Sequence, residues 1–366
     1  MTMIFESANL RARLVPGKDA TRLVITFSSF GKPAAIDRPG FGENFLGDEG
    51  VAAIHVVAKG NRWFQYPELP AMIAAISKTS EQYSRVISYG SSMGGFAALR
   101  YGGDCGADVG LAISPQFSLD RREVPFEIRW KREAARIKSW FPSCKPLAKQ
   151  VIVYDPRHAL DAQHYETFKR RANVIPLRVP HGGHPAGGVL AQAGLLKGLV
   201  LDVLSADFDP RSYEVTLRGV RVQNSQYLFT VARRLKPYHS RLRLILAEMA
   251  LSRDTSPHVY SFTAECLEAV GRTQEAEIAH LHAIRTGDGD ALRRFGRFLM
   301  TARRYHEAAR VIDGAIEASP DSLARRLLRW RLRIRHPFSG GVAGAAKAWK
   351  RYPYAEGRAT SRIRRR

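Results

Sequence analysis

The pattern of apolar residues changes once along this chain of 366 residues, and that change limits the folds open to it. Up to about residue 205, short apolar runs rich in β-branched side chains alternate with stretches in which apolar residues recur at helical spacing. From about Tyr238 only the helical pattern remains. Two parts of different fold class are therefore expected. The chain length also suggests two domains, since a domain has roughly 150 residues.

The first part reads as a strand–helix alternation. The apolar runs are Leu23–Phe27, Val51–Val57, Arg85–Tyr89, Val109–Ile113, Gln150–Tyr154 and Val174–Val179. The helical patterns are Pro70–Lys78, Met93–Arg100, Ala162–Arg171 and Gly188–Leu204. This order predicts an α/β fold with a mostly parallel sheet covered by helices on both faces. Met3–Phe5 and Leu10–Val15 are predicted to add antiparallel edge strands.

One segment, residues 116–149, interrupts the alternation. It places Trp130 and Trp140 among many basic residues, and we interpret it as a helical insertion. Either it forms a surface helix pair with a solvated basic face, or it forms a lid above the C-terminal ends of the strands, where ligands bind in such sheets. The resulting division is an α/β domain at 1–205, a linker at 206–237, helical repeats at 238–352 and a basic tail at 353–366.

The second part contains an internal repeat. Leu267–Ala276 matches Leu299–Ala308 at an offset of 32 residues, and the same offset carries Ala283 onto Ala315. The repeat resembles the tetratricopeptide repeat, whose period is about 34 residues. The resemblance covers about residues 256–322 and implies pairs of packed helices that bind a protein partner through residues 238–352. It departs from the family pattern at Arg303, where a glycine is common.

The sharpest chemical signal is Gly90-Ser-Ser-Met-Gly-Gly95, which gives G-x-S-x-G with Ser92 at its centre. The motif follows an apolar strand and precedes a helix. This context is typical of a nucleophile elbow, a sharp turn that presents a serine hydroxyl at the top of a sheet. Small residues on both sides of the serine allow the strand and the helix to approach each other.

With this motif, residues 1–205 resemble the α/β-hydrolase superfamily. The resemblance implies a serine nucleophile followed along the chain by an acid and then a histidine. Asp155 directly follows the fifth apolar run, and His184 lies in the glycine-rich loop after the sixth. We therefore predict Ser92, Asp155 and His184 as the catalytic residues. His181 and Asp161 remain open as alternatives, the latter also being a good helix N-cap. His158 and His164 are interpreted as surface residues.

Two further groups of residues are expected around the serine. The resemblance implies an oxyanion hole made of backbone N–H groups, for which we predict Met93 and, in the loop after the first long strand, Phe30. Trp63 and Tyr66 follow the Val51–Val57 strand on the same side as the elbow. They either wall the substrate pocket, which is our prediction, or pack beneath the following helix.

Charge is unevenly distributed. The whole chain has a formal net charge of +23. Residues 1–205 hold 26 basic and 18 acidic side chains, a net charge of +8, which leaves +15 for residues 206–366. Six arginines lie between positions 325 and 335. Contact with nucleic acid or another anionic surface is one interpretation. A solvated helix face is the one we favour, because no nucleic-acid-binding motif accompanies the charge.

Other features narrow the class of protein. The three cysteines have neither zinc-site nor disulfide spacing, which favours a reducing, cytoplasmic location and predicts no metal. No secretion signal is visible, and no apolar stretch approaches the roughly 20 residues of a membrane span. We expect a serine hydrolase that cleaves an ester or thioester without a cofactor, a peptidase being less favoured. The alternative is a catalytically inactive scaffold that binds proteins.

Overall fold

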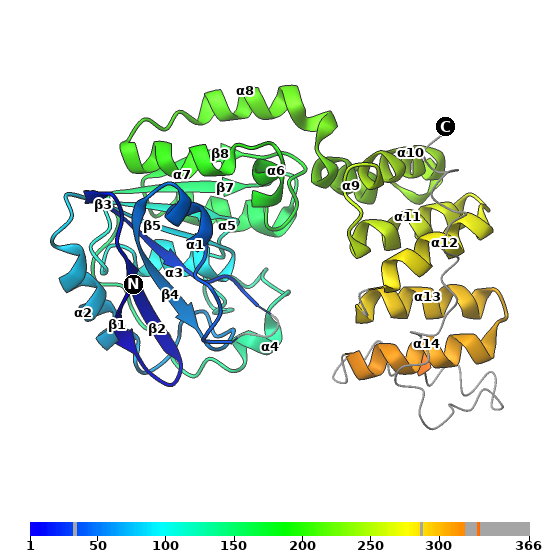
Figure 1. Cartoon of the computed structure of the whole chain (residues 1–366), viewed down its shortest axis with the longest axis horizontal. Helices are drawn as coiled ribbons and strands as arrows, with labels where there is room; N and C mark the ends of the chain where they lie inside the picture. Colours follow the sequence, from blue (N-terminus) through cyan, green and yellow to red (C-terminus); the bar gives the residue numbers. More distant parts are fainter. Residues whose placement is uncertain (32–34, 286–287, 319–327, 330–366) are drawn as a thin grey trace. The chain divides into compact units, whose positions relative to one another are not determined.

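A computed structural model describes residues 1–31, 35–285, 288–318 and 328–329. It consists of two compact units, Met1–Tyr227 and Leu228–Arg366, each of which is described by itself (Figure 1). The predicted basic tail at 353–366 and the arginine run, apart from Arg329, lie outside the described residues.

The first unit is built on one sheet of eight strands in the order β1-β2-β4-β3-β5-β6-β7-β8. Pairings β1–β2 and β2–β4 are antiparallel, and the others are parallel. The strands are β1 (Thr2–Glu6), β2 (Leu10–Val15), β3 (Asp19–Phe27), β4 (Val51–Ala58), β5 (Arg85–Ser91), β6 (Val109–Ile113), β7 (Lys149–Tyr154) and β8 (Val174–Arg178). The predicted mostly parallel sheet, with its antiparallel edge, is confirmed.

Helices cover both faces of this sheet (Figure 1). One apolar cluster joins the sheet to α2 (Leu69–Ser80), α3 (Met93–Tyr101) and α5 (Ala159–Lys169). The other joins it to α1 (Glu43–Asp48), α6 (Gly187–Gln192), α7 (Leu196–Ser205) and α8 (Pro210–Val220). Because successive strand residues point to opposite faces, Leu23 and Ile25 enter the first cluster while Val24 enters the second.

The segment 116–149 is ordered but contains little helix. Its one helix, α4, has four residues (Lys131–Ala134), and turns and irregular backbone make up the rest. The prediction of a helical insertion is therefore wrong in its secondary structure. Prolines at 142 and 146 disfavour a helix only over the last part of the segment. The segment is held instead by its apolar side chains, among them Trp130 and Trp140, which pack against the first cluster.

Residues 206–237, predicted as a linker, are largely helical. They comprise α8, the 3₁₀ turn η1 (Arg221–Gln223) and α9 (Ser225–Arg234). Helix α8 is part of the first unit, because Leu217 is buried in the second apolar cluster and the Tyr213 hydroxyl donates to Asp202.

The second unit is a run of paired helices. After η2 (Pro237–His239) come α10 (Ser240–Leu251), α11 (Pro257–Ala269), α12 (Thr273–Ile284), α13 (Gly289–Thr301) and α14 (Tyr305–Ala318). The 32-residue repeat is visible in the backbone, since Gly271 and Arg303 both adopt left-handed φ values, of 78° and 61°. Ala276 and Ala308, at matching positions, are both fully buried. The predicted helical-repeat fold is confirmed.

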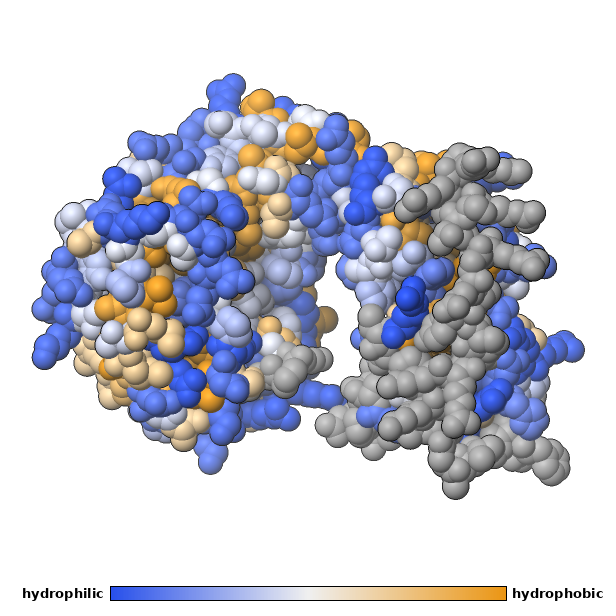
Figure 2. All heavy atoms as spheres, viewed as in Figure 1, coloured by the Kyte–Doolittle hydropathy of each residue, from blue (hydrophilic) through white to orange (hydrophobic). Residues whose placement is uncertain are grey.

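Hydrophilic side chains predominate over the surface visible in Figure 2, and apolar ones gather only in small groups. Across the described ranges, no helix combines the length and the apolar character that crossing a bilayer requires.

Candidate active site

Ser92 lies at a sharp turn between β5 and α3. Its backbone angles, φ 51° and ψ −113°, are strained for a residue with a side chain. Neighbouring glycines make the turn sterically feasible. A Cβ on Gly90 would lie 2.3 Å from the backbone carbon of Gly94, and one on Gly94 would lie 2.2 Å from the carbonyl oxygen of Phe27. The turn therefore has the geometry of the predicted nucleophile elbow.

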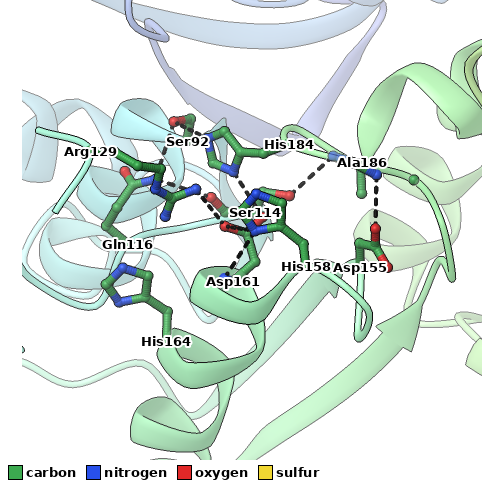
Figure 3. A network of polar contacts seen from close by, with 12 residues as sticks. Ser92, Ser114, Gln116, Arg129, Asp155, His158, Asp161, His164, His184 and Ala186 are labelled. Atoms are coloured by element: carbon green, nitrogen blue, oxygen red, sulfur yellow. Dashed lines mark hydrogen bonds and ion pairs between the residues drawn. The ribbon is translucent and has the colours of Figure 1, made fainter. Parts of the chain in front are cut away.

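A histidine and an aspartate form a chain of hydrogen bonds that begins at this serine (Figure 3). Ser92 Oγ lies 3.0 Å from Nε2 of His184, in the loop between β8 and α6. His184 Nδ1 lies 2.8 Å from Oδ2 of Asp161, on the first turn of α5. A carboxylate only accepts hydrogen bonds, so Nδ1 carries the proton and Nε2 is left as an acceptor for the serine hydroxyl. This is the tautomer that a general base for Ser92 requires.

Asp161 receives two further polar contacts. Arg129 Nη1 donates to its Oδ1 at 2.8 Å, and His158 Nδ1 lies 3.2 Å from the same oxygen. Burial alone would raise the pKa of Asp161. Hydrogen bonds from His158 and His184 outweigh burial and hold that pKa below its usual range. Asp161 is therefore ionised at neutral pH although it is only 2% exposed.

The acid predicted from the sequence, Asp155, has a different place. Both ring nitrogens of His184 are already used, by Ser92 and Asp161. The Asp155 carboxylate is fully buried and accepts backbone N–H bonds from His181 at 3.0 Å and from Gly183 at 3.0 Å. It therefore fastens the loop that carries His184. The open alternative, Asp161, replaces Asp155 as the candidate acid because one turn of α5 brings it to the histidine.

The other histidines are also placed. The ring of His181 packs edge-on against Tyr227, with centroids 5.6 Å apart. His158 is the N-cap of α5, and its ring centroid lies 5.8 Å from that of His184. His164 is fully buried, so its interpretation as a surface residue is wrong. Its position three residues after Asp161 puts it on the same buried face of α5.

The predicted oxyanion donors lie on two different segments of the first unit. Met93 is the first residue of α3, where a backbone N–H has no partner in the preceding turn. Phe30 lies in the loop after β3. Nearby in this loop, the N–H of Ser28 donates to the carbonyl of Val56, and the N–H of Gly31 donates to Asn61 Oδ1. The role of both N–H groups stays a prediction.

Trp63 and Tyr66, predicted as pocket walls, lie instead within the core, 0% and 2% exposed. The loop that carries them turns inward through left-handed φ values at Trp63 (49°) and Phe64 (59°). Trp63 contacts the site through its indole N–H, which donates to Gln116 Oε1 at 3.0 Å. The indole ring of Trp130 lies near the candidate histidine, with a centroid distance of 6.5 Å.

Sequence reasoning missed a polar network supplied by the 116–149 segment. Gln116, fully buried, donates from Nε2 to Ser92 Oγ at 3.2 Å. Arg129 bridges Asp161 and the buried carboxylate of Glu127, and Glu127 Oε2 lies 2.9 Å from Nε2 of His164. No motif marks these residues. The one signal available was that Asp161 and His164 interrupt the apolar stripe of α5.

Two pKa directions show how this network is charged. Burial would raise the pKa of Glu127, but hydrogen bonds from His164 and Arg129 lower it to about 2. Burial lowers the pKa of His164, which the Glu127 carboxylate only partly counteracts. His164 Nδ1 accepts the N–H of Phe117, so the neutral ring donates from Nε2 to Glu127. Glu127 and Asp161 are thus two buried anions that share the guanidinium of Arg129.

Over the described part of the chain, histidine, cysteine and carboxylate side chains nowhere gather in the groups of three or more that hold a metal ion.

Several solved structures of low sequence identity resemble part of this chain. The esterase Est1E from Butyrivibrio proteoclasticus is 15% identical, covers 55% of this chain and 97% of its own, and has a TM-score of 0.38. The capsule O-acetyltransferase of Neisseria meningitidis serogroup A is 16% identical, covers 48% and 85%, and scores 0.35. The tetratricopeptide domain of Sgt2 from Aspergillus fumigatus is 18% identical, covers 38% and 93%, and scores 0.29.

These likenesses concern fold alone. The mostly parallel sheet followed by paired helices, as the sequence indicated, is confirmed by the strand order and the helices themselves. No protein-family model matches the chain, and no curated protein matches it.

Proposed function

We propose that this chain is a serine hydrolase that cleaves an ester or thioester through an acyl-enzyme. The observation that carries the proposal is the continuous contact from Ser92 Oγ to His184 Nε2 (3.0 Å) and from His184 Nδ1 to Asp161 Oδ2 (2.8 Å) at a strained elbow. The serine hydroxyl donates to the imidazole, and the imidazole donates to the carboxylate. This order of hydrogen bonds supports nucleophilic catalysis by the serine.

The reaction follows from these positions. His184 Nε2 takes the hydroxyl proton as Ser92 Oγ attacks the carbonyl carbon, and the ionised Asp161 stabilises the imidazolium that forms. The carbonyl oxygen takes up the negative charge beside the N–H groups of Met93 and Phe30. His184 then returns the proton to the departing alcohol or thiol. In the second half, His184 takes a proton from water as its oxygen attacks the acyl carbon, and returns that proton to Ser92 Oγ as the acid leaves.

Steady-state hydrolysis of p-nitrophenyl esters with acyl chains of increasing length tests this proposal. We expect turnover by the full chain to fall by at least about 10³-fold in Ser92→Ala, which removes only the hydroxyl. Ser88→Ala is the matched control, because Ser88 is a buried serine of β5, the strand that leads to this turn, and its hydroxyl donates to the carbonyl of Ala98. Equal rates in wild type and Ser92→Ala would reject the proposal and favour the inactive-scaffold alternative.

A second role concerns the helical unit, which we propose binds a protein partner and so recruits a macromolecular substrate. A cavity of about 570 Å³ in this unit supports the idea. Arg233 and Arg243 line it and stack over Phe229 and Phe262. Neither guanidinium has a carboxylate partner within the described ranges.

An Arg233→Ala, Arg243→Ala double variant tests this second role. We expect it to lose a co-purified partner of the full chain while p-nitrophenyl ester turnover stays within twofold, since every residue of the candidate site lies in the first unit. Retention of the partner by the double variant would contradict the assignment of this cavity.

A further inference from the structure

Gln116 lies fully buried beside the candidate nucleophile, two residues after Ser114 at the end of β6. Its side-chain amide makes three hydrogen bonds. Oε1 accepts the indole N–H of Trp63 at 3.0 Å, and Nε2 donates to Ser92 Oγ at 3.2 Å and to the carbonyl oxygen of Ser114 at 3.4 Å. None of the proposed reaction steps involves this amide.

The orientation of the amide follows from its neighbours. An indole N–H only donates, so the amide atom facing Trp63 must be the oxygen. A backbone carbonyl only accepts, so the atom facing Ser114 must be the nitrogen. Both neighbours require the same orientation, which leaves an N–H of Gln116 directed at Ser92 Oγ.

This orientation also settles the direction of the serine hydroxyl. Because Ser92 Oγ accepts from Gln116, its single proton is available for His184 Nε2. Every hydrogen bond from Trp63 to Asp161 then points the same way (Figure 3 shows the part from Gln116 onward). A donor-only indole begins the series and an acceptor-only carboxylate ends it.

We propose, on the basis of the function proposed above, that Gln116 is a further catalytic residue and that Trp63 is its positioning residue. When Ser92 Oγ gives its proton to His184 and attacks, negative charge develops on Oγ. The Gln116 N–H stabilises that charge. The same N–H stabilises Oγ again when the acyl bond breaks during deacylation. Trp63 contributes by preventing the amide from turning its oxygen toward the serine.

The test is the kinetics of labelling by a fluorophosphonate probe, which forms a phosphorus–oxygen bond to Ser92 Oγ and releases fluoride. Saturation kinetics separate the binding constant KI from the maximal rate constant kinact. Gln116→Met keeps the side-chain length and removes the donor. A hydrogen bond to a charged group corresponds to roughly a 10- to 100-fold effect, so we expect kinact to fall by about that factor with KI unchanged.

Trp63→Phe keeps an aromatic ring in the core but removes the indole N–H and part of the ring volume, so its unfolding free energy is measured beside kinact. It also tests the idea if Gln116→Met does not fold. We expect about a tenfold fall in kinact, because the amide loses the hydrogen bond from the indole that fixes its orientation toward Ser92. The Trp63→Phe, Gln116→Met double variant should be no slower than Gln116→Met alone, since Trp63 acts through the amide. A purely structural role would make the two losses multiply.

Gln150→Met is the matched control, because Gln150 is another buried glutamine of the sheet, 8% exposed on β7. It should keep the wild-type kinact. Wild-type labelling with an unchanged kinact in Gln116→Met would overturn the role of Gln116 and leave the proposed hydrolase intact. A wild-type chain that reacts with no fluorophosphonate would overturn both.

Discussion

The two units of this chain use charged residues in different ways. In the first unit, the ion pairs beside the candidate site are buried: the side chains of Glu127 and Asp161, both paired with Arg129, are 2% and 1% exposed. In the helical unit, the ion pairs that recur with the repeat are more exposed. Arg272 pairs with Glu275 three residues later, with side chains 41% and 42% exposed, and the repeat places the same pairing at Arg304 and Glu307.

This difference separates residues that support a site from residues that support a scaffold. A buried anion must keep its partners, because its desolvation is costly and only those partners offset it. An exposed pair contributes about 1 kcal/mol or less, since water and salt screen it. This contrast leads to four measurable differences, which decrease in size from Asp161 to Gly296.

The largest effect should distinguish the two aspartates near His184. Asp161→Asn removes the acceptor that keeps the proton on His184 Nδ1, and we expect ester turnover to fall by about 10³- to 10⁴-fold. Asp155→Asn is the control, because its carboxylate binds backbone N–H groups of the loop. It should lower the thermal midpoint while reducing turnover far less. Equal losses of turnover in the two variants would contradict the assignment of Asp161.

Arg129 should matter more for stability than any exposed arginine. Arg129→Met leaves the carboxylates of Glu127 and Asp161 facing each other without the shared guanidinium, which costs about 3–5 kcal/mol of unfolding free energy. Arg272→Met, in the helical unit, should cost less than about 1 kcal/mol. Hydrogen exchange of peptides from each unit measures both local stabilities. Similar protection losses would remove the contrast between the units.

Glu127 should make the first unit sensitive to acid. Its folded pKa, about 2, lies below its ordinary value of 4.5, so its stabilising contribution is present above pH 4.5 and is lost as the pH falls toward 2. The full contribution is about 3 kcal/mol. Glu127→Gln should therefore lose less stability than wild type between pH 5 and pH 3, measured as the thermal midpoint. Parallel pH profiles would refute this linkage.

The smallest effect concerns packing in the helical unit. A Cβ on Gly296 of α13 would lie 2.6 Å from Cγ1 of Ile312 in α14. We expect Gly296→Ala to cost about 1 kcal/mol, because overpacking outweighs the gain in helix propensity. Hydrogen exchange should increase only in helical-unit peptides, and p-nitrophenyl ester turnover should remain unchanged. A loss of turnover would contradict the independence of the site from this unit.

Local patterns predicted the sheet well, because a strand buried on both faces leaves a nearly continuous apolar run. The run Arg85–Tyr89 lies within β5, and Val109–Ile113 matches β6. The insertion was predicted poorly. Its apolar side chains pack against the first apolar cluster, so tertiary packing, which no local pattern reveals, decides its path.

The candidate site divides in the same way. Ser92 and His184 were predictable because an elbow and a loop after the last strand are features of local sequence. Asp161 could not be chosen over Asp155, since the choice depends on how a turn of α5 projects toward another loop. Gln116 and Arg129 come from irregular backbone, where no periodicity tells which side chain points inward.

The most direct test of the central claim is to trap the acyl-enzyme. The full chain is incubated with p-nitrophenyl acetate, quenched in acid and digested, and its peptides are weighed by mass spectrometry. The account predicts one added acetyl group on the peptide that contains Ser92, and none in Ser92→Ala or His184→Ala. An acetyl group on another residue, or the same adduct in His184→Ala, would contradict it.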